Sequence, residues 1–258
     1  MKLGAIAAIV LLSACSNEND SKAQPGEVAL RLIQTSDIHS NVLGYDYYQN
    51  KEDRKFGLSR TALLIRAARA ENPNNLLLDN GDLIQGTPLA DYIFEQSGAG
   101  YLDKQAHPVF KAMNELGYDA GNLGNHEFNY GLDYLTKTLQ GAKFPYVNAN
   151  VFEAGAFKRD AKGQIDWSGN KFTPYLLLER KVKDDKGQLQ TVKVGILGLT
   201  PPQVLQWDKR HLEGKVVVAD MVETANHYVP ELRAKGADLV VVVAHTGINA
   251  NSYEAMME

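Results

Sequence analysis

Residues that can bind metal ions follow apolar runs at several points of the sequence. Asp37 and His39 come just after the run 28–35, and Asp82 follows the run 75–79 in an Asn-Gly-Asp triplet. A carboxylate oxygen and an imidazole nitrogen are suitable ligands for a borderline divalent metal. Ligand-binding groups gather at the carboxyl ends of strands in α/β sheets. Each triplet also suits an ordinary polar loop or turn, so neither identifies a site by itself.

Two later histidines occupy comparable positions. Asn125 and His126 lie in the segment GNHEF at 124–128, where a neutral amide ligand precedes an imidazole that can reach a phosphoryl oxygen or a leaving group. His245 follows the run 239–244, the most strand-like of the chain. A core or capping role for His126 and a helix or turn contact for His245 are the structural alternatives. The recurrence of ligand types at what we expect to be four strand ends favours a site that binds two metals.

Strands and helices must alternate along the chain to position these motifs. Short apolar runs predict buried strands at 28–35, 75–79, 146–150, 192–199 and 239–244. The remaining apolar patterns predict helices at 57–71, 107–116, 131–140 and 221–235. The segment 152–193 predicts an antiparallel hairpin with a turn at 183–187. The alternation predicts an α/β fold.

The N-terminal segment predicts export. Residues 1–14 combine one positive charge with an apolar run too short to span a bilayer. Small residues precede Cys15, the only cysteine, as in bacterial lipoprotein signals that are cleaved before a lipid-modified cysteine. An ordinary signal cleaved near Ala14 is the alternative. We therefore expect a periplasmic protein anchored to a membrane through Cys15, with a tether at 15–26 and a catalytic domain at 27–258.

The charge balance limits the class of substrate. The net charge is −4 and no block of lysine and arginine occurs, so the sequence does not predict binding of a nucleic-acid polymer. Small anionic substrates remain compatible with this balance if metal ions supply the positive charge. No protein partner is predicted.

The motifs together resemble those of calcineurin-like metallophosphoesterases, within their 5′-nucleotidase branch. Asp37-x-His39, Gly81-Asp82, 124–127 (GNHE) and His245 occur in the order of that family. The segments 79–92 (DNGDLIQGTPLADY), 107–131 and 201–209 are more similar to the bacterial 2′,3′-cyclic-nucleotide 2′-phosphodiesterase/3′-nucleotidases than to their 5′-specific relatives. The resemblance covers roughly 28–258 and implies a four-layer α-β-β-α sandwich.

The resemblance also implies a mechanism and its residues. Asp37, His39 and Asp82 would bind one divalent metal, and Asp82, Asn125 and His245 the other, with zinc, manganese, iron or cobalt as the possible ions. The metals would activate a water, and His126 would stabilise the phosphoryl group and protonate the leaving oxygen. Glu127 would orient His126 or its loop. The substrates would be mononucleotides: 2′,3′-cyclic nucleotides opened to 3′-nucleotides, which are then cleaved to nucleoside and phosphate.

Two departures from the family pattern accompany the resemblance. Family members carry a later G-H-x-H motif and a C-terminal nucleoside-binding domain, and neither follows His245. Residues 251–258 resemble the start of a helix. We therefore expect a C-terminally incomplete chain with weak metal binding and poor turnover. A 5′-nucleotidase or UDP-sugar hydrolase, which would use the same metal motifs, is one alternative. A lipoprotein that binds a ligand without chemistry is the other.

Overall fold

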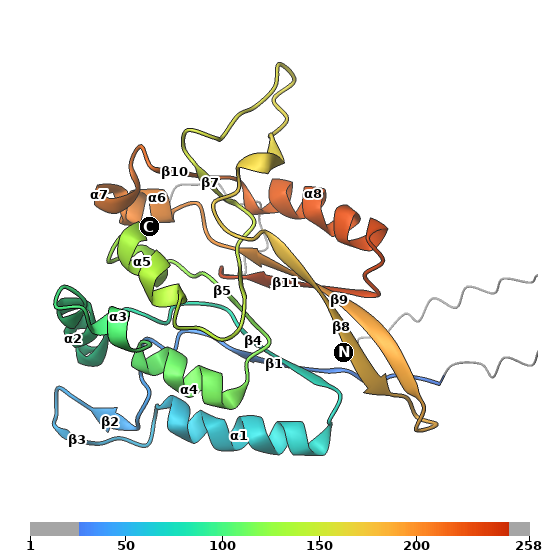
Figure 1. Ribbon diagram of the computed structural model, residues 1–258, viewed down its shortest axis with the longest axis horizontal. Helices are drawn as coiled ribbons and strands as arrows, with labels where there is room; N and C mark the ends of the chain where they lie inside the picture. Colours follow the sequence, from blue (N-terminus) through green and yellow to red (C-terminus); the bar gives the residue numbers. More distant parts are fainter. Residues whose placement is uncertain (1–25, 248–258) are drawn as a thin grey trace, which may run out of the picture.

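Two β-sheets lie face to face between helices in the computed structural model (Figure 1), which describes residues 26–247. The predicted signal peptide, Cys15 and the helix expected at 251–258 lie outside the described residues. The first sheet is parallel and has the order β1-β4-β5-β6. Its strands are β1 (Arg31–Thr35), β4 (Asn75–Asp79), β5 (Ala120–Asn122) and β6 (Tyr146–Val147).

The second sheet is mixed and has the order β11-β9-β8. A hairpin of β8 (Tyr175–Lys183) and β9 (Leu189–Leu199) is antiparallel, and β11 (Leu239–Ala244) pairs with β9 in parallel. Two short antiparallel pairs complete the strands: β2 (Tyr45–Asp46) with β3 (Lys51–Glu52), and β7 (Val151–Glu153) with β10 (Val216–Val218).

Helices cover the outer face of each sheet (Figure 1). The first sheet is covered by α1 (Leu58–Glu71), α4 (Pro108–Leu116) and α5 (Leu132–Leu139), and the second by α8 (Met221–Ala234). The remaining helical segments are α2 (Pro88–Ser97), α3 (Tyr101–Lys104), η1 (His126–Phe128), η2 (Trp167–Gly169), α6 (Val204–Trp207) and α7 (Lys209–Leu212). No helix within residues 26–247 is long and apolar enough to cross a membrane.

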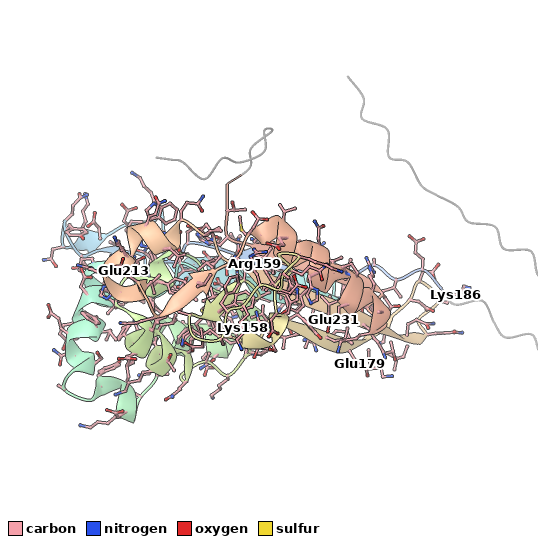
Figure 2. The ribbon with its side chains drawn as sticks, turned by 90° about the horizontal axis from the view of Figure 1, so that it is seen from above. Lys158, Arg159, Glu179, Lys186, Glu213 and Glu231 are labelled. Atoms are coloured by element: carbon pink, nitrogen blue, oxygen red, sulfur yellow. The ribbon has the colours of Figure 1, made fainter. Side chains whose placement is uncertain are left out.

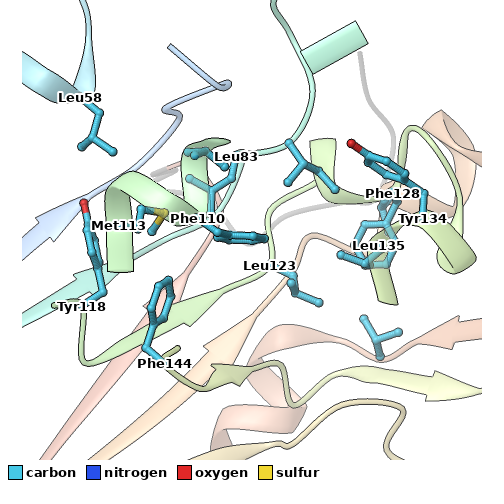
Figure 3. Packing of buried hydrophobic residues seen from close by; sticks show 14 of the residues in the cluster. Leu58, Leu83, Phe110, Met113, Tyr118, Leu123, Phe128, Tyr134, Leu135 and Phe144 are labelled. Carbon is cyan, nitrogen blue, oxygen red and sulfur yellow. The ribbon is translucent and has the colours of Figure 1, made fainter. Parts of the chain in front are cut away.

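Apolar side chains point alternately to the two faces of the strands and so form three apolar layers. In β4, Leu77 faces the helices, in the cluster that also contains Phe110 and Met113 (Figure 3), whereas its neighbours Leu76 and Leu78 face the second sheet. β9 alternates in the same way, because Val194 and Ile196 pack with the first sheet whereas Leu197 and Leu199 belong to the cluster that contains α8. The predicted four-layer α-β-β-α arrangement is therefore confirmed.

Most of the predicted elements are present, with shifted ends. β4 and β11 have the predicted bounds, and the hairpin of β8 and β9 turns where the sequence predicted it. The prediction of a strand at 146–150 was too long, because Asn148 and Asn150 turn their side chains to Thr200 instead of continuing the ladder. β1 begins at Arg31 rather than at residue 28, and as an edge strand it is not buried on both faces, since Leu32 is 45% exposed.

Charged side chains of both signs lie on the surface. Exposed residues include the adjacent pair Lys158 and Arg159, and Glu179 and Glu213 from two other segments (Figure 2). Arg159 pairs with Glu223 of α8 at 2.7 Å, and Lys209 pairs with Glu213 at 3.3 Å. The exposed cations named here therefore do not form a single basic strip along the molecule.

Candidate metal centre

Predicted metal ligands and the predicted catalytic residue His126 converge where strands of the two sheets end. Asp37 follows β1, Asp82 follows β4, His126 follows β5, and His245 directly follows β11. The backbone N–H of His245 donates to the carbonyl of Leu199, the last residue of β9, at 3.0 Å. Because β1, β4 and β5 are parallel, their carboxyl ends lie on one edge of the first sheet, next to the end of β11.

Asp82 lies at the centre of the group. Its Oδ2 is 3.2 Å from Nε2 of His245 and 4.0 Å from Nε2 of His126. Nε2 of His39 is 3.9 Å from Oδ1 of Asp37. Ligand atoms of His39, Asp82 and His126 lie within 4.8 Å of one another, and so do those of Asp37, Asp82 and His245. Asp82 belongs to both groups, so its two carboxylate oxygens can serve two ions.

Backbone carbonyls orient two of the histidine rings. Nδ1 of His39 lies 2.7 Å from the carbonyl oxygen of Gln85, and Nδ1 of His245 lies 2.7 Å from that of Asn80. A carbonyl oxygen only accepts, so each Nδ1 carries the hydrogen and each neutral ring presents the lone pair of Nε2 to the site. Such contacts fix the tautomer and orientation of histidines that bind metals.

Among the described residues, four of the five non-glycine residues with a positive φ lie at the site. Asp37, His39, Ser40 and Asp82 have φ angles of 56°, 47°, 56° and 61°, in the left-handed region that non-glycine residues rarely adopt. The cost is of order 1–3 kcal/mol for each residue and persists only where surrounding contacts fix the conformation. Here Ser40 donates its hydroxyl to the carbonyl of Leu83 at 2.7 Å. Strain at four neighbouring positions is typical of a functional site.

Glu127 connects the loops that carry the ligands. Its buried carboxylate accepts the backbone N–H groups of Asp82, Leu83 and Gly124 at 2.7, 2.6 and 2.7 Å. Burial and the charge of Asp82 raise its pKa, and the three N–H groups oppose this. Glu127 therefore fixes the loop after β4 against the loop after β5.

Charge and burial have opposite effects on the pKa values of Asp82 and His245. Burial alone would lower the pKa of His245, but its hydrogen bond to Asp82 and the negative charge of that carboxylate raise the pKa to about 9. Burial alone would raise the pKa of Asp82, and the hydrogen bond and positive charge of His245 lower it instead. In the protein without metal, the two side chains therefore favour an ion pair.

The donor atoms fit a divalent metal. Ligand atoms of His39, Asp82 and His126 form one group, and those of Asp37, Asp82 and His245 form the other. Asn125 immediately precedes η1, is partly exposed and makes no capping hydrogen bond with its side chain, and its role as a neutral ligand stays a prediction. Oxygen and imidazole ligands of this mixture suit zinc, manganese, iron and cobalt.

A buried polar network that the sequence did not reveal connects the two sheets behind the ligands. Nδ2 of Asn122, at the end of β5, donates to the carbonyls of Leu199 and Val243 in the second sheet, at 2.8 and 2.9 Å. Nδ2 of Asn148 donates to the hydroxyl of Thr200 at 2.5 Å. Asparagines are common in turns, so only the pairing of the strand ends reveals this role.

The sequence of this chain is similar to a known protein family and to several of its members. Residues 30–256 match the family model of the calcineurin-like phosphoesterases. The chain is 54% identical over 231 residues to the 2′,3′-cyclic-nucleotide 2′-phosphodiesterase/3′-nucleotidase of Salmonella typhimurium. The aligned region covers 90% of this chain and 34% of that protein. The chain thus spans about a third of the length of this relative. It is 30% identical over 223 residues to a 5′-nucleotidase of Vibrio parahaemolyticus, covering 84% of this chain and 33% of that protein.

A solved structure has the same arrangement. The crystal structure of the calcineurin-like phosphoesterase YfkN from Bacillus subtilis matches with a TM-score of 0.79 and 48% sequence identity, covering 89% of this chain and 65% of that chain.

Proposed function

This chain belongs to the calcineurin-like phosphoesterase family, and from that premise we propose that it hydrolyses mononucleotides with two divalent metal ions. The proposed substrates are 2′,3′-cyclic nucleotides, opened to 3′-nucleotides, and 3′-nucleotides, cleaved to nucleoside and phosphate. The convergence of Asp37, His39, Asp82, His126 and His245 at the strand ends is the observation that carries the proposal. The name of the Salmonella typhimurium relative supports the substrate class.

The residues present have distinct roles in this proposal. Asp37, His39 and Asp82 would bind one ion, and Asp82, Asn125 and His245 the other. Bound metals lower the pKa of water and neutralise the phosphoryl charge. Glu127 contributes by fixing the loops on which these ligands lie.

His126 is the proposed general acid. Its side chain is 35% exposed, and Nε2 lies 4.0 Å from Asp82, so the ring is open to a bound substrate. It would donate a proton to the leaving oxygen of the sugar, a contribution of about 10²–10⁴ in rate.

The test is hydrolysis of 2′,3′-cyclic AMP, 3′-AMP and 5′-AMP by this protein, with added Mn²⁺ or EDTA. We expect Mn²⁺-dependent cleavage of the first two substrates and its loss in Asp82→Asn. Cleavage of 5′-AMP alone would favour a 5′-nucleotidase. Metal binding without any hydrolysis would contradict the enzymatic proposal and favour a ligand-binding lipoprotein.

We also propose a periplasmic location with a lipid anchor on Cys15. The basis is the sequence of residues 1–15 alone, since this segment lies outside the described residues. We expect the protein to partition into detergent and the Cys15→Ser variant to remain in the aqueous phase. Equal partitioning of the two proteins would contradict the anchor.

A further inference from the structure

The ring of His126 is held by a short chain of side chains on the side away from Asp82. Nδ1 of His126 lies 2.6 Å from Oδ1 of Asn129. Nδ2 of Asn129 donates to both carboxylate oxygens of Asp208, at 3.0 and 2.9 Å. Asp208 lies between α6 and α7, 79 residues after Asn129, and is 3% exposed.

The order of donors along this chain is fixed by chemistry. A carboxylate oxygen accepts hydrogen bonds, so Asp208 must face the amide nitrogen of Asn129. The amide oxygen of Asn129 then faces Nδ1 of His126, and an amide oxygen also only accepts. Nδ1 of His126 therefore carries a hydrogen, and in the neutral ring the lone pair is on Nε2, the atom that faces Asp82.

We propose that Asn129 and Asp208 are positioning residues that select the Nδ1–H tautomer of His126 and hold its Nε2 toward the reacting atoms. Selection of the tautomer is a property of the chain alone. Its consequence for catalysis rests on the proposed function, in which His126 is the general acid. The Nδ1–H tautomer is the form that remains after Nε2 gives up its proton, so the held ring needs no rearrangement during the step.

The proton transfer balances on these atoms. The oxygen of the attacking water forms a bond to phosphorus and loses a proton to solvent, the bond between phosphorus and the leaving oxygen breaks, and the electron pair of the broken bond stays on the leaving oxygen. The proton passes from Nε2 to the leaving oxygen, and the electron pair of that N–H bond remains on Nε2 as its lone pair. Nδ1 keeps its hydrogen bond to Asn129. The amide of Asn129 connects Asp208 to the ring without placing a carboxylate directly against it.

The contacts of Asp208 separate this role from a purely structural one. Its backbone N–H donates to Val204 at 2.9 Å and its carbonyl accepts from His211 at 2.8 Å, and these bonds hold α6 and α7 whatever the side chain is. Within residues 26–247, the side-chain hydrogen bonds of Asp208 go to Asn129. A change of its side chain therefore acts on the orientation of Asn129.

Nitrogen-15 NMR of the His126 ring in the metal-free protein tests the proposal directly, at a pH where the ring is neutral. We expect the Nδ1–H form in the parent protein and in Asp208→Asn, because an asparagine at 208 retains one acceptor oxygen. Asp208→Leu, which removes the acceptor, should give both tautomers in comparable amounts. Asn129→Ala, at a partly exposed position, should give the same mixture and serves if leucine at buried position 208 prevents folding.

Steady-state kinetics of the protein provide the second measurement. We expect Asp208→Leu and Asn129→Ala to lower kcat on 3′-AMP by about 10²-fold with little change in KM, the size of a misplaced catalytic group, and Asp208→Asn to retain most of the rate. A parent protein in the Nε2–H form, or variants with unchanged tautomers, would overturn the proposal. Absence of hydrolysis in all the proteins, with the expected NMR result, would overturn the proposed function and leave the tautomer selection standing.

Discussion

Replacing Gly124 with alanine would place a methyl group inside the metal centre. The added carbon would lie 2.2 Å from Oδ1 of Asp82 and 2.8 Å from Cε1 of His245, whereas ordinary contacts are 3.4–4 Å. It would also lie 2.8 Å from the backbone nitrogen of Asp82. The carboxylate of Asp82 must therefore move by about 1 Å, because the backbone behind it leaves no room for the methyl group.

That displacement would disturb both oxygens of the central ligand. Oδ1 of Asp82 accepts the backbone N–H of His126 at 2.8 Å, and Oδ2 lies 3.2 Å from His245. Hydrogen bonds of this kind span 2.7–3.2 Å, so a shift of about 1 Å breaks at least one of them. We expect a loss of about 1–3 kcal/mol in folding free energy from overpacking, and about 10²-fold in the hydrolysis rate from misplacement.

Calorimetric titration of the metal-free protein with Mn²⁺ and hydrolysis of 3′-AMP together measure the effect. Gly155→Ala is the matched control, because Gly155 is exposed and a methyl group there would meet nothing within 4 Å. We expect the control to bind Mn²⁺ and to turn over like the parent protein. Parental Mn²⁺ affinity and parental rate in Gly124→Ala would refute the assignment of Asp82 as the shared ligand.

Two further predictions concern buried groups. Burial lowers the pKa of His107 to about 4 from an ordinary 6.5, so the unfolded chain binds the extra proton and stability falls by about 3 kcal/mol as pH drops from 6.5 to 4. His107→Asn keeps an acceptor for the N–H of Val109. In urea unfolding, this variant should lose less free energy of unfolding between pH 6.5 and 4 than the parent protein. An equal loss in both proteins would contradict the assignment to His107. Glu127→Gln turns an amide NH2 group toward a backbone N–H and should lower the free energy of unfolding by about 1–3 kcal/mol in thermal unfolding. The exposed control Glu213→Gln should lower it by less than about 0.5 kcal/mol. Equal losses in the two variants would contradict the role of Glu127.

The ligand positions could be predicted from the sequence because each depends on a local relation. Asp37, Asp82 and His245 come within three residues of the end of a strand, and the apolar runs that mark those strands are visible in the chain. The assignment to the calcineurin-like phosphoesterases and the four layers, which followed from resemblance, are confirmed. Which metal each ligand binds stays a prediction.

The rest of the site depends on contacts between distant residues. β5 has only three residues and contains Gly121, so no apolar run marks it. Asn122 reaches Val243 across 121 positions, and Asp208 reaches Asn129 across 79. Asparagine and aspartate at such places resemble turn residues in the sequence, because their local hydrogen-bonding pattern is the same. Only the three-dimensional arrangement shows which of them connect strand ends.

The same arrangement explains why metal ions should contribute to folding as well as to chemistry. Asp79, Asp82 and Glu127 are buried near one another, and no lysine or arginine among residues 26–247 forms a salt bridge with any of them. Burial raises the pKa of Asp79 to about 8 and also raises that of Glu127, with repulsion between the carboxylates adding to both. Two divalent ions would offset this repulsion at the point where β1, β4, β5 and β11 end. Metals bound by the folded chain alone shift the equilibrium toward it, so we expect the strand ends and the active site to become ordered in the same step.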